Sequence, residues 1–460
     1  MFIFSWVRIM ARKDMGERNT DARSKFGDTP SNDIPSLTAS LDELLDHATL
    51  DPDGHTGRMI AVFAEGIETD TSEIMEQAFS ATPAHSHDFG EDAVDFSALG
   101  TADALTFDNL GIAVLGGPAA AAANEISESA DGDIAETMER PYVLVPETME
   151  FIMAMDPASY LRGFRAASDR IATDLLDNMP ELAPELDLDE GADTASVTWG
   201  LSVTRAPLSP FTGRGIRVAI LDTGLDFGHP DFVGRRILAQ SFIAGESPQD
   251  GNGHGTHVAG TACGPRVPRT SAPRYGIAHG CDILVGKVLS NAGSGPTASI
   301  LAGINWALQN GAQVINMSLG NRTRTPALHY NQAGQRALAQ NSLIIAAAGN
   351  FNEPTGQPAN SPSIMSVASI TSTMQKSTFS NHGKVEICAP GSSIDSALPR
   401  PRLRGFLNGT SMAAPHVAGI AALQSQGRAL RGIALWRHLQ ATARRLTLPT
   451  AQQGAGMVRS

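Results

Sequence analysis

From residue 196 to the C-terminus, short runs that are almost wholly apolar alternate with segments of helical periodicity. The apolar runs are "IRVAILD", "CDILVGKVL", "AQVINMSLG", "SLIIAAAGN", "SIMSVASI" and "VEICAPG", and helical stretches such as "TASILAGINWALQN" and "YNQAGQRALAQ" lie between several of them. Strands that are apolar on both faces are typical of parallel sheets covered by helices on both sides. We therefore predict an α/β domain with a doubly wound parallel sheet over residues 196–460.

Polar residues stand where several of these predicted strands end. Asp222 ends the first run, Ser318 to Gly320 end the third, and Asn350 ends the fourth. In open α/β sheets the functional residues gather outside the carboxyl ends of the strands. We expect a site at that edge of the sheet.

A serine precedes a run of small residues in "NGTSMAAPHVAGIAAL", residues 408–423. Small side chains suit a helix that is packed tightly on all sides, and Ser411 would lie at its N-terminus. Free N–H groups and the helix dipole favour negative charge there, which suits a nucleophile. Taken alone, such a serine is more often a helix cap than a nucleophile.

Two further segments change that balance. Asp222 opens "DTGLDFGHPDF", and His254 follows two glycine-bearing dipeptides in "DGNGHGTHVAGTACG". With Ser411 they give Asp, His and Ser in chain order. His257 forms an H-x-x-H pair with His254, but no third ligand is evident, so a packed structural histidine is favoured over a metal ligand. His229 and His416 are interpreted as structural for the same reason.

Together the segments Asp-Thr-Gly, His-Gly-Thr-His-Val-Ala-Gly and Gly-Thr-Ser-Met-Ala-Ala-Pro-His-Val-Ala-Gly resemble the signatures of the subtilisin-like serine proteases (subtilases, peptidase family S8). The resemblance covers about 196–458, from "TWGLSVTRAP" to a closing strand at "GAGMV". It implies a serine endopeptidase that works through an acyl-enzyme. Ser411 would be the nucleophile, His254 the base, Asp222 its orienting partner and Asn350 a side-chain donor to the oxyanion.

The same resemblance suggests which residues bind substrate. "GSG" and "SLG" resemble backbone edges that pair with an extended peptide. The predicted binding residues are Gly293, Ser294, Gly295, Ser318, Leu319, Gly320, Ala348 and Gly349. Gly356 would leave the primary specificity pocket open, which favours an apolar side chain before the scissile bond, whereas Glu353 would favour a basic one.

The N-terminal 195 residues differ sharply in charge from the rest. They carry a net charge of −28, against +14 for residues 196–460. The asymmetry fits either a solvated acidic segment or an acidic domain that docks on a basic one. We predict a disordered leader over 1–55, a small α+β domain of split-βαβ (ferredoxin-like) type over 56–148, and a helix with an acidic linker over 149–195.

The α+β domain resembles the family's inhibitory propeptide (inhibitor I9 type). Strands are predicted at "RMIAVFAE", "LGIAVLGG" and "PYVLVPE", and helices at "TSEIMEQAFSA" and "AAAAANEISESA". We therefore expect an autoprocessed zymogen in which the acidic prodomain folds and blocks a basic protease domain. The helix predicted at 157–177 would be a spacer or a second latch.

Other features narrow the expectations further. No apolar run reaches the length of a membrane span, and the N-terminal "MFIFSWVRIM" makes a poor signal peptide, although the resemblance implies an extracellular enzyme. Cys263, Cys281 and Cys388 cannot build a disulfide framework, which leaves a Cys263–Cys281 pair open. No cofactor is required, but the resemblance leaves a weak calcium site near Asp231 open.

The expected partners are protein or peptide substrates and the chain's own prodomain, and we expect a monomer that binds no nucleic acid. Two alternatives stay open. One is a catalytically silent binding protein of this fold, and the other is a dedicated intracellular processing protease for one partner.

Overall fold

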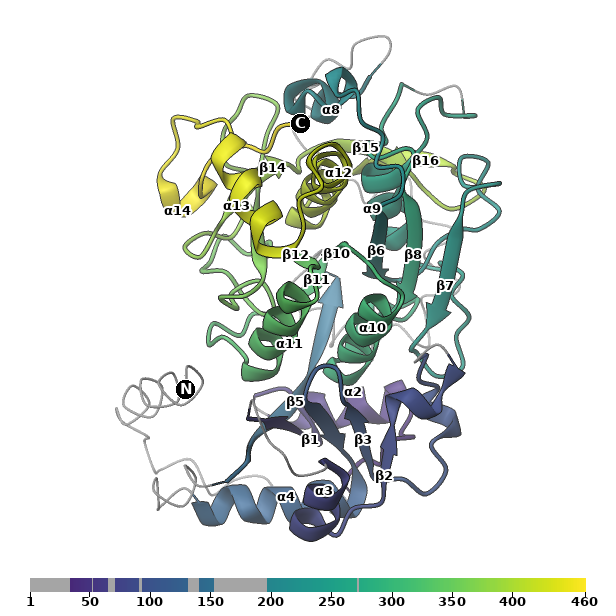
Figure 1. Cartoon of the computed structure of the whole chain (residues 1–460), viewed down its shortest axis with the longest axis vertical. Helices are drawn as coiled ribbons and strands as arrows, with labels where there is room; N and C mark the ends of the chain where they lie inside the picture. Colours follow the sequence, from purple (N-terminus) through teal and green to yellow (C-terminus); the bar gives the residue numbers. More distant parts are fainter. Residues whose placement is uncertain are drawn as a thin grey trace.

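The computed structural model describes residues 34–51, 53–64, 71–90, 93–130, 140–152, 197–270 and 273–460. Residues 34–152 form a small layer beneath the larger part made of residues 197–460 (Figure 1). The helix predicted at 157–177 and the linker after it lie outside the described residues. None of the helices in the described part of the chain is long and apolar enough to cross a bilayer.

The C-terminal part is built on a parallel sheet, as the sequence predicted. In its described residues seven strands follow the order β14-β13-β12-β10-β6-β8-β7, and every pair is parallel. The strands are β6 (Arg217–Asp222), β7 (Ile237–Ser241), β8 (Asp282–Lys287), β10 (Val314–Met317), β12 (Leu343–Ala347), β13 (Met365–Ile370) and β14 (Ile387–Pro390).

Helices cover both faces of this sheet. They are α9 (His254–Cys263), α10 (Thr297–Gln309), α11 (Leu328–Ala339), α12 (Thr410–Arg428) and α13 (Gly432–Thr442). Alternate side chains of β6 divide between them. Val218 and Ile220 pack in the core of α9 and α12, and Ala219 and Leu221 pack in the core of α10 and α11. The sheet is therefore doubly wound.

The sequence analysis missed one strand and predicted another that is not fully formed. The edge strand β7 was not predicted, because "ILAQS" is only half-buried and carries little apolar signal. The segment "GAGMV" is not a full strand, since Met457 forms only isolated bridges with Cys388 and Arg444. The remaining short elements here are α8 (Trp199–Thr204), η4 (Ala206–Leu208), β9 (Ser294–Pro296), β11 (Leu319–Gly320), β15 (Ile394–Ala397), β16 (Arg404–Leu407) and α14 (Thr450–Gln453).

The N-terminal part is a second sheet with two helices on one face. Its strands are β1 (His55–Phe63), β2 (Pro83–His85), β3 (Ala104–Phe107), β4 (Ile112–Leu115) and β5 (Tyr142–Ile152), and its helices are α3 (Thr71–Phe79) and α4 (Gly117–Ala130). The order β5-β1-β4-β3 with antiparallel neighbours agrees with the predicted split-βαβ arrangement. The edge strand β2, which pairs in parallel with β3, was not predicted.

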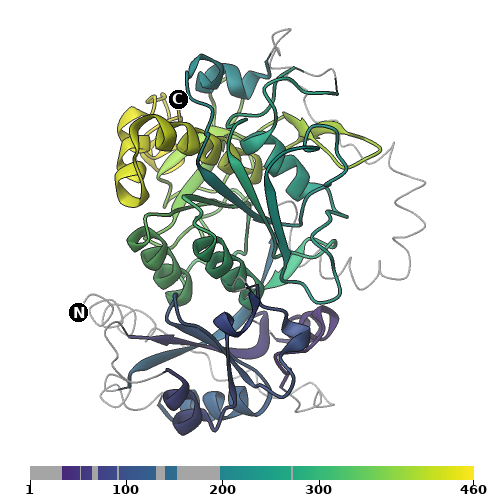
Figure 2. The same cartoon turned by 45° about the vertical axis from the view of Figure 1, so that its right-hand side comes forward.

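The two faces of this sheet have different partners. Met59, Ala61 and Phe63 of β1 pack against α3 and α4. Ile60 and Val62 point the other way and share one apolar core with α10 and α11 of the C-terminal part. Figures 1 and 2 show α10 and α11 lying between the two sheets. The two parts therefore join through a buried apolar layer.

The predicted disordered leader over residues 1–55 is wrong for its described end. Residues 41–50 form α2 (Leu41–Leu50), which begins at the cap Ser40, whose hydroxyl accepts the amide of Glu43 at 3.2 Å. Leu44, Leu45 and Ala48 are buried against Met149 and Phe151 of β5. The helix is short and most of its residues are polar, so its composition resembles that of a disordered segment.

The last strand of the N-terminal part extends beyond the predicted domain end at residue 148. Up to Thr148 β5 pairs with β1, and from Met149 to Ile152 it pairs instead with β9 and β11 of the C-terminal part. One strand of the N-terminal sheet therefore pairs with two short strands of the C-terminal part, and Figure 1 shows it rising from the lower layer into the upper one.

Candidate active site

The carboxyl ends of two neighbouring strands bring the predicted catalytic segments together. The register of β6 and β10 pairs Leu221 with Met317, so the next residues, Asp222 and Ser318, are also neighbours. Asp222 holds His254 at the start of α9, and Ser318 holds Ser411 at the start of α12. The site thus lies at the edge of the sheet where the sequence predicted it.

Asp222 and His254 form a buried hydrogen-bonded pair. His254 Nδ1 lies 2.8 Å from Asp222 Oδ1, and the two side chains are 6% and 0% exposed. Oδ1 also accepts the amide of Thr223 at 2.8 Å, which fixes the carboxylate. A carboxylate at Nδ1 places the proton on that nitrogen, so Nε2 is left to act as the base.

Burial and charge pull the pKa of His254 in opposite directions. Burial alone would lower it, but the charge of Asp222, the hydrogen bond to Asp222 and the charge of Asp250 together outweigh burial. The net pKa lies above the ordinary value of 6.5. The imidazolium that forms when Nε2 takes a proton is therefore stabilised by the site.

Asp250, which the sequence analysis missed, organises the start of α9. Its two oxygens accept the amides of Asn252, Gly253 and Thr256, and the hydroxyls of Thr223 and Thr256. The carboxylate is buried, but these hydrogen bonds offset the free-energy cost of removing it from water. The signal was present in the sequence, since "DGNG" ahead of a helix resembles a capping loop.

Ser411 occupies the second position of α12. Its hydroxyl donates to the carbonyl of Ser318 at 3.0 Å, and the Ser318 hydroxyl donates to the carbonyl of Ser411 at 2.8 Å. Nε2 of His254 is buried and has no hydrogen-bond partner among the described residues. The base is therefore free to accept a proton, and the hydroxyl must turn from Ser318 to His254 for the reaction.

Donors for an oxyanion lie beside the serine. Asn350 Oδ1 accepts both the amide of Thr410, at 2.8 Å, and the Thr410 hydroxyl, at 2.9 Å. This leaves the Asn350 NH₂ group to point away from Thr410 as a donor. The amides of Thr410 and Met412 are bonded within the loop, to Asn350 and to Gly409. The Ser411 amide carries no such bond in the described part of the chain, so it is the backbone donor that remains.

The other histidines of these motifs are structural, as predicted. His257 Nε2 lies 2.9 Å from the carbonyl of Ile394, and burial lowers the His257 pKa to about 3. His416 Nδ1 lies 2.8 Å from the carbonyl of Met412, and burial lowers its pKa to about 4. His229 Nε2 contacts the carbonyl of Leu403 at 2.8 Å.

The predicted substrate strands flank β5. Phe151 pairs with Ser294 and with Gly320, Glu150 pairs with Gly295, and Ile152 pairs with Leu319. The Ile152 amide donates to the carbonyl of Gly293 at 2.8 Å. An extended segment of the chain itself thus lies where an extended peptide was expected.

Two other predicted binding residues lie at the oxyanion side rather than against β5. The Gly349 amide donates to the Thr410 hydroxyl at 3.1 Å, and the Ala348 carbonyl accepts the side-chain amide of Asn381 at 3.1 Å. These bonds fix the strand end that carries Asn350.

Glu353 is taken up by two arginines at the surface. Its carboxylate lies 2.6 Å from Arg322 and 3.5 Å from Arg324. An anion that is already paired is a poor ligand for a basic substrate side chain.

A buried lysine is the second residue that the sequence analysis missed. Lys287, at the end of β8, is fully buried and donates to the carbonyl of Thr223 at 2.6 Å and to Asn291 at 2.9 Å. It also pairs with Glu246 at 3.1 Å. Thr223, the residue after Asp222, is therefore fixed through its carbonyl by Lys287 and through its hydroxyl by Asp250. A lone lysine inside the apolar run "CDILVGKVL" was the available signal.

Asp231 is already engaged by the chain itself. Its carboxylate accepts the amide of Arg269, the hydroxyl of Thr270 and the hydroxyl of Tyr275. Burial and the neighbouring Asp231 together raise the Tyr275 pKa well above its usual range. Asp231 thus anchors the arginine-rich loop instead of presenting free oxygens to a cation.

The three cysteines are buried free thiols. The open Cys263–Cys281 pair is therefore not a disulfide in this structure. Arg235 donates to the backbone carbonyls of both residues and holds them together.

Comparison with known proteins agrees with this geometry. Residues 213–459 match the model of the subtilase family, Peptidase_S8. Alkaline elastase YaB of Bacillus sp. (strain YaB) is 35% identical over 337 residues, which are 67% of this chain and 86% of that protein. Subtilisin Savinase of Lederbergia lenta is 39% identical over 270 residues, which are 57% of this chain and 97% of that protein.

A solved structure gives the same answer for the fold. A cold adapted subtilisin-like serine proteinase aligns with a TM-score of 0.50 and 34% identity, over 57% of this chain and 97% of its own. The matched family, these relatives, the buried Asp222–His254 pair and Ser411 at the start of α12 lead to one conclusion. The chain belongs to the subtilase family and is a subtilisin-like serine endopeptidase.

Proposed function

We propose that this endopeptidase is made as a zymogen whose N-terminal domain, residues 34–152, occupies the substrate cleft until the enzyme cuts it off. The observation that carries the proposal is the pairing of β5 with both β9 and β11. A strand added between two substrate-binding edges excludes any other extended peptide from them.

The chemistry follows from the site residues. Ser411 attacks the scissile carbonyl as His254 takes its proton, and the Asn350 NH₂ group and the Ser411 amide stabilise the oxyanion. His254 then gives the proton to the leaving amine, and water repeats the sequence on the acyl-enzyme. Asp222 keeps His254 in the required tautomer and stabilises its charge.

The register of β5 supports a place for the cut. Ile152 pairs with Leu319, and the residue before Leu319 is Ser318, whose carbonyl accepts the hydroxyl of Ser411. The end of β5 at Ile152 is therefore aligned one residue short of the strand position that holds the nucleophile. We expect the cleaved bond to be one of the first few after Ile152.

A buried, ion-paired carboxylate of the N-terminal domain also binds the protease domain. Glu147 of β5 accepts two bonds from the Arg58 guanidinium, at 2.6 and 2.9 Å, and the amide of Ala298 at 2.8 Å. Ala298 lies in the first turn of α10, where the helix dipole favours a carboxylate. The N-terminal domain thus completes a helix end that belongs to the protease.

Other polar contacts join α10 and α11 to the loop between β3 and β4. Gln332 donates to the carbonyls of Leu110 and Gly111, at 2.9 and 2.6 Å, and Asn109 donates to Asn305 at 3.3 Å. Together with the shared apolar core, these contacts support a role of the N-terminal domain in folding the protease domain.

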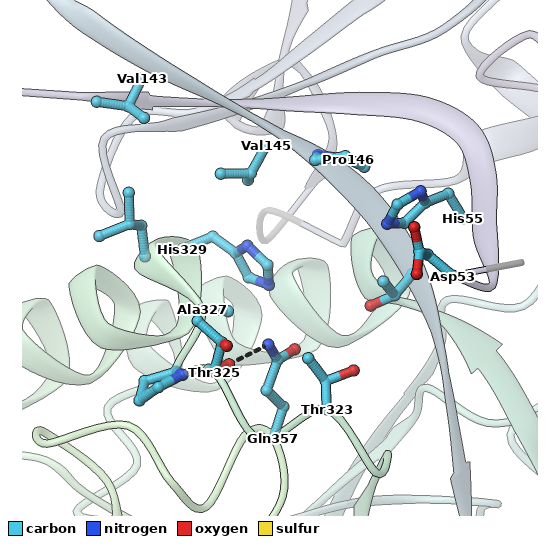
Figure 3. Close-up of a pocket in the computed structure, with 13 residues that line it drawn as sticks. Asp53, His55, Val143, Val145, Pro146, Thr323, Thr325, Ala327, His329 and Gln357 are labelled. Carbon is cyan, nitrogen blue, oxygen red and sulfur yellow. Dashed lines mark hydrogen bonds between the residues drawn. The ribbon is translucent and has the colours of Figure 1, made fainter. Parts of the chain in front are cut away.

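The interface is not packed everywhere. A cavity of about 480 Å³ lies between Val143, Val145 and Pro146 of β5 and the segment 323–329 (Figure 3). His329 lines it, is 3% exposed and has no hydrogen-bond partner for either ring nitrogen in the described residues. Such a gap makes the interface weaker than a fully packed one, which suits a domain that must dissociate after cleavage.

For substrates, we propose an apolar side chain before the scissile bond. The arginine partners of Glu353 support this choice over a basic one, because they leave no unpaired anion there.

The zymogen proposal is tested by diluting freshly purified full-length protein over a hundredfold range and following cleavage by intact mass. Cleavage within one chain predicts a rate constant that does not change with dilution, and a new N-terminus within a few residues of Ile152. A rate that falls in proportion to concentration, or a cut elsewhere in the chain, contradicts the proposal.

A further inference from the structure

A carboxyl group is buried in the middle of the strand that fills the cleft. Glu150 of β5 is fully buried, although it lies between the substrate strands β9 and β11. No ion pair of Glu150 occurs in the described part of the chain, so the groups around it must accommodate a neutral acid or an unpaired charge.

Two donors of the protease domain converge on one oxygen of this group. The Tyr330 hydroxyl, on α11, donates to Glu150 Oε1 at 3.0 Å, and the Asn321 side-chain NH₂, directly after β11, donates to the same oxygen at 3.1 Å. The second oxygen, Oε2, is buried and has no hydrogen-bond partner among the residues that the structure describes. An oxygen that accepts two bonds beside one that accepts none fits a carbonyl next to an uncharged group better than a carboxylate, whose two oxygens share the charge and both need donors.

The surroundings support the neutral form. Burial is the largest influence on Glu150 and raises its pKa to about 8, although its hydrogen bonds act in the opposite direction. Glu147, another carboxylate of β5, is paired with Arg58. Burial raises the Tyr330 pKa well above its usual range, so this hydroxyl keeps its proton and donates.

The other described neighbours named below carry no charge, and the Thr148 side chain also hydrogen-bonds the Glu150 carboxyl. Thr148 of β5 and Thr297 of α10 face each other with their hydroxyls 3.3 Å apart. Burial lowers the pKa of His329, next to Tyr330, to about 3, so it is neutral at and above pH 5.

We propose that Tyr330 and Asn321 form a specificity subsite that selects substrates with an uncharged carbonyl-bearing side chain, a carboxamide or a protonated carboxyl, at the position that Glu150 occupies. This inference rests on the proposed zymogen arrangement, because β5 stands in for the substrate. Both donors belong to the protease domain and stay with it after cleavage. An apolar side chain at this position would bury the two donors without an acceptor, which is costly.

The test uses peptides that copy residues 148–157 and carry Gln, Glu or Leu at the position of Glu150. The enzyme is the active material that the full-length chain yields, and cleavage is measured as kcat/KM. At pH 8.5 we expect the Gln peptide to be cut about tenfold faster than the Leu peptide, because two buried hydrogen bonds distinguish them. Equal rates, or faster cleavage of the Leu peptide, would overturn the inference.

The Glu peptide adds a second, independent readout. Its carboxyl must take up a proton on binding, so the ratio of Glu to Gln cleavage should fall by up to about tenfold per pH unit as pH rises from 6 towards 8. The other ionisable groups are common to both peptides and cancel in the ratio. A ratio that does not change with pH contradicts a subsite for the neutral form.

Two variants assign the effect to the named residues. Tyr330→Phe removes one donor and Asn321→Asp replaces the other with an acceptor, and each should reduce the Gln-to-Leu preference at least threefold. Asn341→Asp makes the same charge change at an exposed position and should leave the preference unchanged. Preferences that survive both subsite variants would overturn the assignment.

Failure of the proposed function would look different. In that case the full-length chain would not lose its N-terminal domain, whatever the relative rates on the three peptides. Processed enzyme that cuts all three peptides at equal rates would leave the zymogen proposal intact and refute only the subsite.

Discussion

The side-chain oxygen of Asn350 accepts the backbone amide of Thr410 at 2.8 Å, one residue before the nucleophile. This bond fixes which end of the Asn350 amide faces the substrate, because the oxygen is committed to the helix start and only the NH₂ group is left. The Asn350 side chain therefore fixes the position of the segment after β12 relative to the first turn of α12.

Replacing Asn350 by Leu should lower kcat far more than it raises KM. The NH₂ group contacts charge that develops only in the transition state, so its loss affects the chemical step. We expect a fall of about 10²–10³-fold in kcat, the size known for such a donor in a subtilisin and not one read from this structure. Steady-state kinetics on a small peptide substrate measure it. A kcat within threefold of wild type would remove Asn350 from the oxyanion site.

The pH dependence of the enzyme should follow His254. The base must be neutral to accept a proton, so kcat/KM should rise with pH through the His254 pKa, which Asp222 and Asp250 hold above 6.5. In Asp222→Asn the charge that raises this pKa is gone while burial still lowers it. The small activity that remains, about 10⁴-fold below wild type, should therefore reach its plateau at lower pH. A pH profile of kcat/KM checks the shift, and an inflection that moves upward would contradict it.

The Arg58–Glu147 pair should contribute strongly to the stability of the uncleaved chain. Both side chains are almost fully buried, at 2% and 0% exposure, so removing either one leaves an unpaired charge inside the interface. In a Ser411→Ala background, which keeps the chain whole, Arg58→Met should lower the free energy of unfolding by about 3–5 kcal/mol in urea.

The matched control is Arg236→Met. Arg236 pairs with Asp282 at 3.6 Å but is 82% exposed, so its loss should have little effect. Adding Glu147→Met to Arg58→Met should restore part of the loss, because no unpaired charge remains. Equal effects of the Arg58 and Arg236 changes would contradict the account of the interface.

Calcium should not stabilise the enzyme through Asp231. The carboxylate is engaged by Arg269, Thr270 and Tyr275 and has no need of a cation. A calcium ion present at 100 times its Kd would add about 2.7 kcal/mol, which for a domain of this size raises Tm by about 5–10 °C. We expect the Tm of the processed enzyme in EDTA and in millimolar calcium to agree within about 2 °C. A larger shift that disappears in Asp231→Asn would contradict this expectation.

Much of the site could be predicted from the sequence because each catalytic residue stands in a long local signature at a strand or helix end. Asp222, His254, Ser411 and Asn350 all lie at the predicted edge of the sheet. The apolar runs also gave the strands of the doubly wound sheet, because burial on both faces leaves a continuous signal.

What the sequence did not predict depends on contacts between distant segments. The helix α2 is short and polar, and it is stable because it packs on Met149 and Phe151, about a hundred residues away. The hydroxyl bond from Ser411 to Ser318 depends on how two strand ends are aligned. Nothing in the pattern around Glu150 distinguishes it from a surface glutamate, since its burial comes from Tyr330 and Asn321 of another domain.

The measurement that tests the central claim most directly compares the intact mass of wild-type protein and Ser411→Ala after incubation at neutral pH with a fluorophosphonate probe. The account predicts that wild type loses its N-terminal domain just after Ile152 and that the remaining chain carries one probe. It predicts that Ser411→Ala stays whole and unlabelled. A wild-type chain that remains uncut and takes up no probe, or a Ser411→Ala chain that is cut in the same way, would contradict it.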